Sequence, residues 1–289
     1  MEYLKCRFSL DCSEELATIA GEILASQVAD AGFEAFENNG EQLVGYVQKR
    51  LFDPMKLREC INTFPLESVS ITYQIDEAEN KNWNEAWESE GFAPILIDNA
   101  MIVYDAKHPL PVEYSLEKYK YAIAIDACQA FGTGTHQTTQ MMLEQILHTE
   151  LMEKTVIDAG CGSGILSIAA VKCGAKHVFA YDIDEWSVRN TVHNAHINGI
   201  SSVEATQGDA SCLRKMHGKA DVVLANINRN ILLQDMPRFC TALSKGGILI
   251  ISGFYDEDAS MLVRQAKALG LSPIGQAECG NWCSLVFKQ

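Results

Sequence analysis

The chain has 289 residues, of which 47% are hydrophobic and 21% are charged, and its formal net charge at pH 7 is −15. This length and apolar content allow one large core or two unequal ones. Such an acidic chain would repel a phosphate backbone, so direct nucleic-acid binding is not expected. The acidity either favours a basic protein partner or serves solubility alone.

Neither a targeting segment nor a membrane span is expected. The amino terminus, MEYLKCRFSLDCSEE, interrupts its apolar residues with charges and has no secretory apolar core. The longest apolar stretch, GGILIISGF at 246–254, is far shorter than the roughly 18 residues that cross a bilayer. The 10 cysteines lack the spacing of zinc ligands. We therefore expect a cytoplasmic protein with free thiols, no metal and no membrane association.

Residues 1–76 predict a small ferredoxin-like α+β domain. Alternating apolar residues predict a strand at 3–10, and Ser13 can cap a helix at 14–30. Two short strands around the turn residues Asn39 and Gly40 suggest a hairpin. A helix at 54–64 and a strand at 68–75 complete a β-α-β-β-α-β pattern.

Residues 77–115 are predicted to form a linker helix followed by a hairpin. The acidic segment 77–90 is helix-prone and carries Trp83 and Trp87 four positions apart, a spacing that favours packing over a direct substrate role. The next segment, FAPILIDNAMIVYDAKHP, has two apolar runs separated by Asp98 and Asn99. That separation predicts a hairpin leading into the next domain.

Residues 116–289 alternate apolar strands with amphipathic helices, a pattern typical of a parallel sheet covered on both faces. A helix is expected in every gap between strands. Two further runs around Gly280 and Asn281 predict an antiparallel hairpin at the sheet edge. The predicted strands are 155–160, 177–183, 203–209, 220–227 and 246–254.

The motif VIDAGCGSGILSIAA runs from a strand through Asp158, Gly160, Gly162 and Gly164 into a helix. Glycines at a strand end let a ligand lie against the backbone. The dinucleotide fingerprint needs the spacing G-x-G-x-x-G, whereas this turn has G-x-G-x-G.

Two more acids follow the next strands. Asp182 is predicted to accept hydrogen bonds from both ribose hydroxyls of a cofactor, and Asp209 could face its adenine amino group. A single strand-end Asp is often only a cap, but Asp158, Asp182 and Asp209 end successive strands.

The fourth strand ends at Asn226. A lysine amine with a pKa near 10.4 is almost fully protonated at pH 7, so presenting it neutral costs about 4.6 kcal/mol. The carbonyl oxygen of Asn226 could accept a hydrogen bond from the amine and aim its lone pair at a methyl group. The alternative is that Asn226 caps the helix that starts near Asn228.

The segment AFGTGTHQTTQMML at 130–143 lacks the Lys of a phosphate loop. The hydroxyls of Thr133, Thr135, Thr138 and Thr139 could bind a polar ligand or neighbouring backbone. His136 is more readily a structural histidine than a general base.

Together these motifs resemble the bacterial ribosomal protein L-eleven (L11) methyltransferases over nearly the whole chain. The resemblance rests on NWNEAW, AFGTGTHQTT, VIDAGCGSGILSIAA, YDIDEWSV and ANI, of which AFGTGTH is the most discriminating. It implies a Rossmann-like seven-stranded class I methyltransferase domain that binds S-adenosylmethionine through Thr139, Gly160, Asp182 and Asn226. It also implies that the leading domain binds the ribosomal protein, while the linker lets the catalytic domain move between several target amines.

The sequence departs from the pattern of that family at several positions. They concern substrate positioning more than cofactor binding. The departures are Asp126-Ala127-Cys128 in place of Asp-Pro-Gly, Gln137 in place of proline, and Asn228 and Arg229 after ANI in place of small or apolar residues.

The predicted activity is methyl transfer from S-adenosylmethionine to lysine side-chain or N-terminal α-amino groups of a ribosomal large-subunit protein. Asn226 is the predicted catalytic residue. The predicted cofactor-binding residues are Thr139, Gly160, Gly162, Asp182, Asp209 and Asn226. The rival functions are methylation of another protein, a nucleic-acid amine or a small-molecule amine, a nicotinamide oxidoreductase, and a noncatalytic cofactor sensor.

Overall fold

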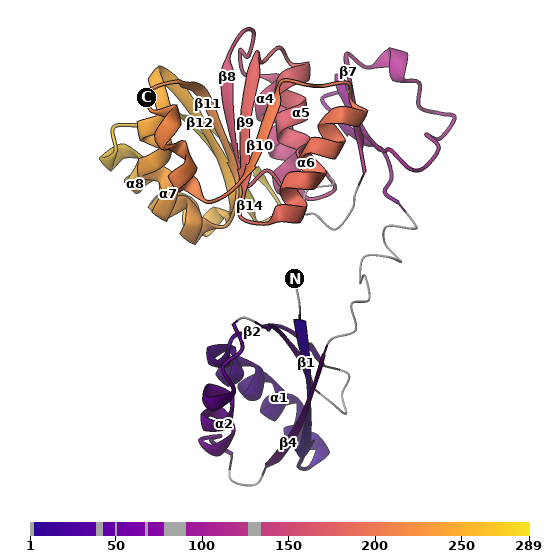
Figure 1. Cartoon of the computed structure of the whole chain (residues 1–289), viewed down its shortest axis with the longest axis vertical. Helices are drawn as coiled ribbons and strands as arrows, with labels where there is room; N and C mark the ends of the chain where they lie inside the picture. The colour runs from indigo at the N-terminus through magenta and orange to yellow at the C-terminus, as the bar shows by residue number, and fades with distance from the viewer. Residues whose placement is uncertain (1–2, 39–42, 50, 67–68, 78–90, 127–133) are drawn as a thin grey trace. The chain divides into compact units, whose positions relative to one another are not determined.

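The computed structural model describes residues 3–38, 43–49, 51–66, 69–77, 91–126 and 134–289 (Figure 1). The chain forms two compact units, residues 1–83 and 84–289. Among the described residues, no helix is long and apolar enough to span a membrane.

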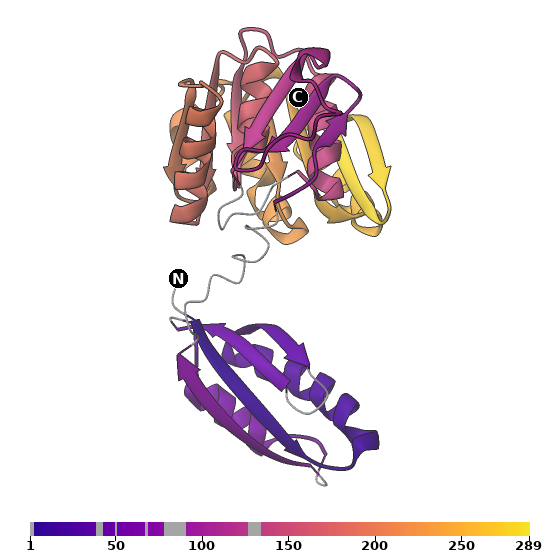
Figure 2. The same cartoon turned by 90° about the vertical axis from the view of Figure 1, so that its right-hand side faces the viewer.

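The first unit has the predicted ferredoxin-like order of elements. Its four-stranded sheet has the order β2-β3-β1-β4, with every neighbouring pair antiparallel. Two helices cover one face of this sheet (Figure 2). The elements are β1 (Tyr3–Asp11), α1 (Glu14–Val28), the 3₁₀ turn η1 (Ala29–Ala31), β2 (Phe33–Asn38), β3 (Leu43–Gln48), α2 (Pro54–Asn62) and β4 (Ser70–Glu77).

Apolar side chains from the sheet and both helices form the core of this unit. Phe8, Leu24 and Leu57 are fully buried, and the rings of Phe8 and Phe33 meet edge to face at 5.7 Å. Within the described residues, the Ser13 side chain at the start of α1 makes no capping hydrogen bond, so the predicted Ser13 cap is wrong. Its helix is instead held by the burial of its apolar face.

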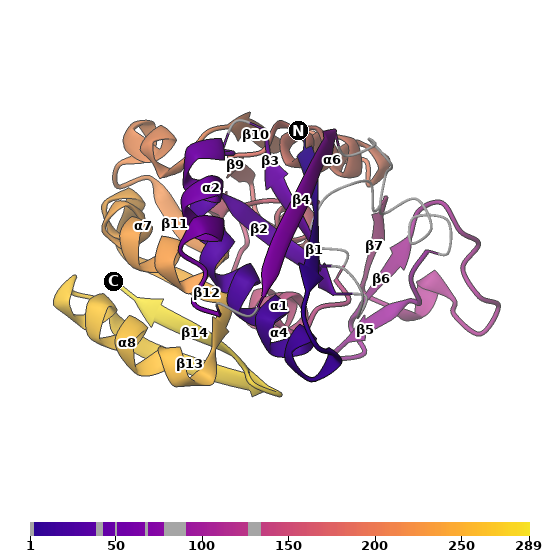
Figure 3. The same ribbon diagram turned by 90° about the horizontal axis from the view of Figure 1, so that it is seen from below.

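The second unit contains a seven-stranded sheet of order β10-β9-β8-β11-β12-β14-β13. The strands from β10 to β12 are parallel, and β14 is antiparallel to both β12 and β13. In Figure 3 the last two strands of the chain, β13 and β14, form one edge of the sheet, as the sequence predicts. The strands are β8 (Thr155–Ala159), β9 (His177–Asp182), β10 (Val203–Gln207), β11 (Ala220–Asn226), β12 (Leu243–Tyr255), β13 (Ser272–Cys279) and β14 (Trp282–Lys288).

Helices lie on both faces of this sheet because its strands are apolar on both faces. Along β8, Val156 belongs to the core under α4 and α5, whereas Ile157 and Ala159 belong to the core under α7 and α8. Figure 1 shows α4, α5 and α6 on one side and α7 and α8 on the other. The helices are α4 (Gln137–Leu147), α5 (Ile165–Lys172), α6 (Glu185–Ile197), α7 (Arg229–Ala242) and α8 (Ala259–Ala268), with 3₁₀ turns η2 (Leu116–Lys118), η3 (Ala210–Met216) and η4 (Asp256–Asp258).

The prediction of an α-helix in every gap between strands is wrong at one place. Between β10 and β11 the chain forms the 3₁₀ segment η3. The stretch between Gln207 and Ala220 is the shortest of the gaps between the parallel strands. This segment brings Asp209 and Ala210 directly after β10.

The predicted hairpin around Asp98 and Asn99 is confirmed, since β5 (Ile95–Ile97) pairs antiparallel with β6 (Met101–Asp105). Both turn residues have positive φ, 48° and 52°, which Asn and Asp tolerate better than most residues. The assignment of this hairpin to a linker is wrong. Its strand β6 also pairs with β7 (Tyr121–Ile125) in a three-stranded sheet of the second unit. The buried Ile97 and Met101 pack in the core under α4 and α5. The predicted helix with Trp83 and Trp87 lies outside the described residues.

Candidate active site

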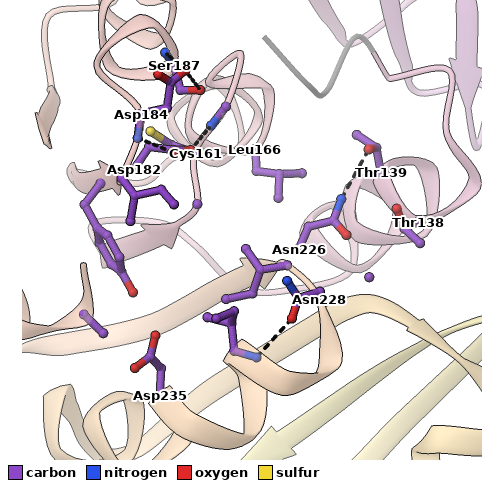
Figure 4. Close-up of a pocket in the computed structure, with 18 of the residues that line it drawn as sticks. Thr138, Thr139, Cys161, Leu166, Asp182, Asp184, Ser187, Asn226, Asn228 and Asp235 are labelled. Atoms are coloured by element: carbon purple, nitrogen blue, oxygen red, sulfur yellow. Dashed lines mark hydrogen bonds between the residues drawn. The ribbon is translucent and has the colours of Figure 1, made fainter. Parts of the chain in front are cut away.

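A pocket of about 750 Å³ lies at the carboxyl ends of the central strands (Figure 4). This volume is typical of a small-molecule site. Open parallel sheets bind ligands at this edge, near the point where the strand order reverses. The predicted cofactor residues all line the pocket: Thr139, Gly160, Gly162, Asp182, Asp209 and Asn226.

The glycine turn after β8 forms the floor of the pocket. Gly160 has φ of 74°, and its N–H donates a 2.9 Å hydrogen bond to the Tyr181 carbonyl oxygen. A Cβ atom on Gly160 would lie 2.4 Å from Cγ2 of Ile227. Position 160 therefore requires glycine both for its backbone conformation and for the close approach of the residue that follows β11.

Asp158 does not join the other two strand-end acids in the pocket. It is fully buried and accepts hydrogen bonds from Ser167 N at 3.0 Å and Ser167 Oγ at 2.6 Å. Desolvation raises the pKa of Asp158 to about 6. Its role is to hold the first turn of α5 against β8, so the expectation that three acids share one site is wrong for Asp158.

Asp182 lines the pocket and also braces the glycine turn. Its Oδ2 accepts a 3.0 Å hydrogen bond from Gly162 N, and its Oδ1 accepts one of 3.0 Å from Asp184 N. Burial raises the pKa of Asp182, an effect opposed by these backbone hydrogen bonds. Each carboxylate oxygen keeps a lone pair for a ligand. The carboxylate is thus fixed in place before any ligand binds.

Asp209 lies at the pocket wall in a more open position. Its Oδ1 accepts a 2.8 Å hydrogen bond from Ser211 N, so it caps η3 as well as lining the pocket. Hydrogen bonds from Ser211 lower the pKa of Asp209. It is therefore a carboxylate at neutral pH and acts only as an acceptor.

Asn226 on β11 and Thr139 on α4 are in direct contact in the lining of the pocket. The Asn226 Nδ2 group donates a 3.3 Å hydrogen bond to Thr139 Oγ1 (Figure 4). The alternative in which Asn226 caps α7 is wrong, because Asn228 holds that position and accepts a 3.1 Å hydrogen bond from Ile231 N. Asn226 is left free to face the pocket.

His136 occupies the N-cap position of α4, where its Nδ1 accepts from Thr138 N at 3.3 Å. The same nitrogen lies 2.8 Å from Thr138 Oγ1. The His136 ring contacts Trp282 edge-on at 4.8 Å. These contacts give His136 the structural role that the sequence favours.

Besides Asn228, two of the departures from the family pattern have visible partners. Arg229 Nη1 lies 2.7 Å from Asp258 Oδ1, which ties the first turn of α7 to η4. Gln137 lies beside Gly280 at the tip of the β13–β14 hairpin, where an added Cβ would meet its Oε1 at 3.3 Å. Ala127 and Cys128 lie outside the described residues.

Several pocket residues were missed in the sequence. Ile183 is 74% exposed, and its signal in the sequence is that an apolar residue directly follows Asp182, the predicted ribose ligand. Tyr181, Asp235 and Trp282 carry no local signal, because they reach the pocket from β9, α7 and β14. Only the folded chain brings them together.

Three features define the class of this protein: the strand order of the sheet, the glycine turn after β8 and the acid Asp182 at the end of β9. The protein is a Rossmann-like methyltransferase that uses S-adenosylmethionine. The model of the family "Ribosomal protein L11 methyltransferase (PrmA)" matches residues 22–289. The chain belongs to this family.

Individual relatives support the same assignment. The ribosomal protein L11 methyltransferase of Bacteroides thetaiotaomicron is 38% identical over 99% of both chains. That of Legionella pneumophila strain Corby is 36% identical over 76% of this chain and 73% of its own. The crystal structure of a ribosomal protein L11 methylase from Lactobacillus delbrueckii subsp. bulgaricus superposes with a TM-score of 0.61 at 30% identity, covering 68% of this chain and 98% of that one.

Proposed function

We propose that this enzyme methylates amino groups of ribosomal protein L11, on lysine side chains, the N-terminal α-amine or both, in the cytoplasm. S-adenosylmethionine supplies an activated methyl group on a sulfonium. Because the sulfonium is already an activated electrophile, the residues of the pocket act by binding and orientation.

The observation that carries this proposal is the hydrogen bond between Asn226 and Thr139. Because Asn226 Nδ2 donates to Thr139 Oγ1, the orientation of the amide is fixed. Its carbonyl Oδ1 receives no hydrogen bond from the part of the chain that the structure describes and can accept one from a neutral amine. This holds the nitrogen lone pair in line for transfer, which is a contribution of orientation and not of acid or base chemistry.

The substrate assignment rests on family membership and charge. A net charge of −15 attracts a basic protein and repels nucleic acid. The ferredoxin-like unit contributes none of the described residues that line the pocket. We assign it to recognition of the protein substrate.

The test is methyl transfer with labelled cofactor and purified L11, followed by mass spectrometry of the modified residues. The wild-type chain should label L11 amines. Asn226→Ala should lower the turnover at saturating cofactor by about 100-fold, the effect of removing one preorganised polar group. Asn230→Ala is a matched control, because Asn230 is exposed on α7 and does not line the pocket. Absence of L11 labelling by a wild-type chain that binds the cofactor would contradict the substrate assignment.

A further inference from the structure

One wall of the pocket carries two buried polar side chains that methyl transfer does not use. Tyr181 comes from β9 and Asp235 from α7, and both line the pocket. Tyr181 is 4% exposed and Asp235 is 6% exposed. Figure 4 shows the Asp235 carboxylate directed into the pocket.

The hydroxyl of Tyr181 is buried without a hydrogen-bond partner among the described residues. Burial raises the pKa of Tyr181, and the nearby charge of Asp235 raises it further. The hydroxyl therefore remains protonated at neutral pH and can donate. A buried donor without a partner is unfavourable compared with phenylalanine at the same position, unless a ligand supplies the acceptor.

Asp235 offers the complementary group. Its Oδ1 lies 2.6 Å from Arg238 Nη1, so it is a paired carboxylate with lone pairs left to accept a donor. The wall thus presents one donor and one acceptor to the same cavity. Ile183 and Ile231 add apolar surface to that cavity, as a flat aromatic ring requires.

We infer that Tyr181 and Asp235 recognise the aminopyrimidine edge of the adenine of S-adenosylmethionine. The Tyr181 hydroxyl donates to the ring nitrogen N1, and Asp235 accepts from the exocyclic N6 amine. That amine has two hydrogens, so Asp209 can accept the other one. This inference rests on the use of S-adenosylmethionine and does not depend on the identity of the methylated protein.

The pair also selects against other purines. In hypoxanthine a carbonyl oxygen replaces the N6 amine and N1 carries a hydrogen. The carbonyl oxygen would face the Asp235 carboxylate, so two acceptors would meet without a hydrogen between them. Asp235, together with Asp209, therefore selects adenine, and Tyr181 adds affinity.

The experiment is titration calorimetry of the full chain with S-adenosylhomocysteine and with S-inosylhomocysteine. Tyr181→Phe should weaken S-adenosylhomocysteine about tenfold, as loss of one buried hydrogen bond does. Asp235→Asn should reduce the preference for the adenosyl over the inosyl ligand by about tenfold, because an amide can also donate to the hypoxanthine oxygen. Tyr104→Phe, on β6 outside the pocket, is the matched control and should bind both ligands as the wild type does.

Thermal unfolding without ligand separates recognition from packing. Since the hydroxyl of Tyr181 has no partner in the described part of the chain, Tyr181→Phe should keep or raise the Tm of the unliganded protein while losing part of the Tm increase that S-adenosylhomocysteine produces. Unchanged ligand affinity in Tyr181→Phe, or an unchanged adenosyl preference in Asp235→Asn, overturns the inference. A wild-type chain that binds neither ligand overturns the use of S-adenosylmethionine itself.

Discussion

Asn226 at the end of β11 and Thr139 in the first turn of α4 are joined by a 3.3 Å hydrogen bond from Nδ2 to Oγ1. The two residues are 87 positions apart in the chain. Thr139 is 1% exposed, so its hydroxyl is a fixed acceptor. The contact gives the Asn226 amide one orientation.

Replacing Thr139 with valine should lower methyl-transfer turnover about tenfold at saturating cofactor, because the Asn226 amide loses the acceptor that orients it. Thr139→Ser keeps the hydroxyl and should retain most of the turnover. Steady-state kinetics of the two variants beside the wild type checks this. Equal losses in the valine and serine variants would show that shape, and not the hydrogen bond, matters at this position.

Asp182→Asn should weaken S-adenosylmethionine about 10- to 100-fold, because the amide loses the charge and one of the two acceptor oxygens, and a hydrogen bond to a charged group contributes about 1.5–3 kcal/mol. Asp209→Asn should weaken it less than tenfold, since Asp209 is exposed and water competes for its lone pairs. Calorimetric titration of both variants measures the difference. Full affinity in Asp182→Asn would remove the ribose-binding assignment.

The buried Asp158 should make stability depend on pH. Its pKa rises from 3.8 to about 6 in the folded chain, so the folded state binds more protons than the unfolded state between these values. Stability therefore falls as the pH rises through these values, by roughly 3 kcal/mol over the whole titration, of which about 2 kcal/mol is lost between pH 4 and pH 6. Asp158→Asn carries no charge and lacks this loss.

Urea unfolding of the wild type and Asp158→Asn at pH 4.5 and pH 7 checks this. The difference in unfolding free energy between them should move in favour of the variant by about 2 kcal/mol between the two pH values. A difference that is the same at both pH values would mean that Asp158 is ionised throughout this range.

Gly160→Ala should disturb the pocket through a steric clash as well as through backbone strain. Its Cβ would meet Ile227 Cγ2 at 2.4 Å, whereas a Cβ at Gly199, with a similar φ of 72°, would meet nothing within 4 Å. Gly199→Ala should therefore show backbone strain alone, roughly 1–2 kcal/mol. Gly160→Ala should lose more stability and also cofactor affinity.

Adding Ile227→Ala to Gly160→Ala should restore part of both losses, because it removes the clashing methyl group. Chemical unfolding and calorimetry of the single and double variants form a double-mutant cycle. A cycle without any coupling energy would place the cause in the backbone conformation of Gly160 only.

Much of the fold follows from local patterns. The strands from β8 to β12 are apolar runs with acids, amides or glycines at their ends, and they were predicted to within a few residues. The Asp98–Asn99 turn was also readable, because both residues tolerate positive φ. The Ser13 cap failed because a residue type that can cap a helix does so only where the backbone brings its oxygen to the right amide.

The site was only partly predictable. Gly160, Asp182 and Asn226 follow strands, and the carboxyl ends of parallel strands meet at one edge. Asp158 is the penultimate residue of β8, whereas Asp182 is the last residue of β9. The side chain of Asp158 lies beneath α5 and accepts hydrogen bonds from Ser167, a contact that depends on how α5 packs against β8.

The sequence by itself determined the order of strands and helices, the glycine turn and the residues at the strand ends, because these depend on neighbours along the chain. Only the tertiary structure decided three contacts. Thr139 orients Asn226, Ile227 packs closely against Gly160, and Tyr181 and Asp235 line the same wall of the pocket. Those contacts join elements far apart in sequence. They form only when the helices pack on both faces of the seven-stranded sheet and place the ends of strands and helices beside each other.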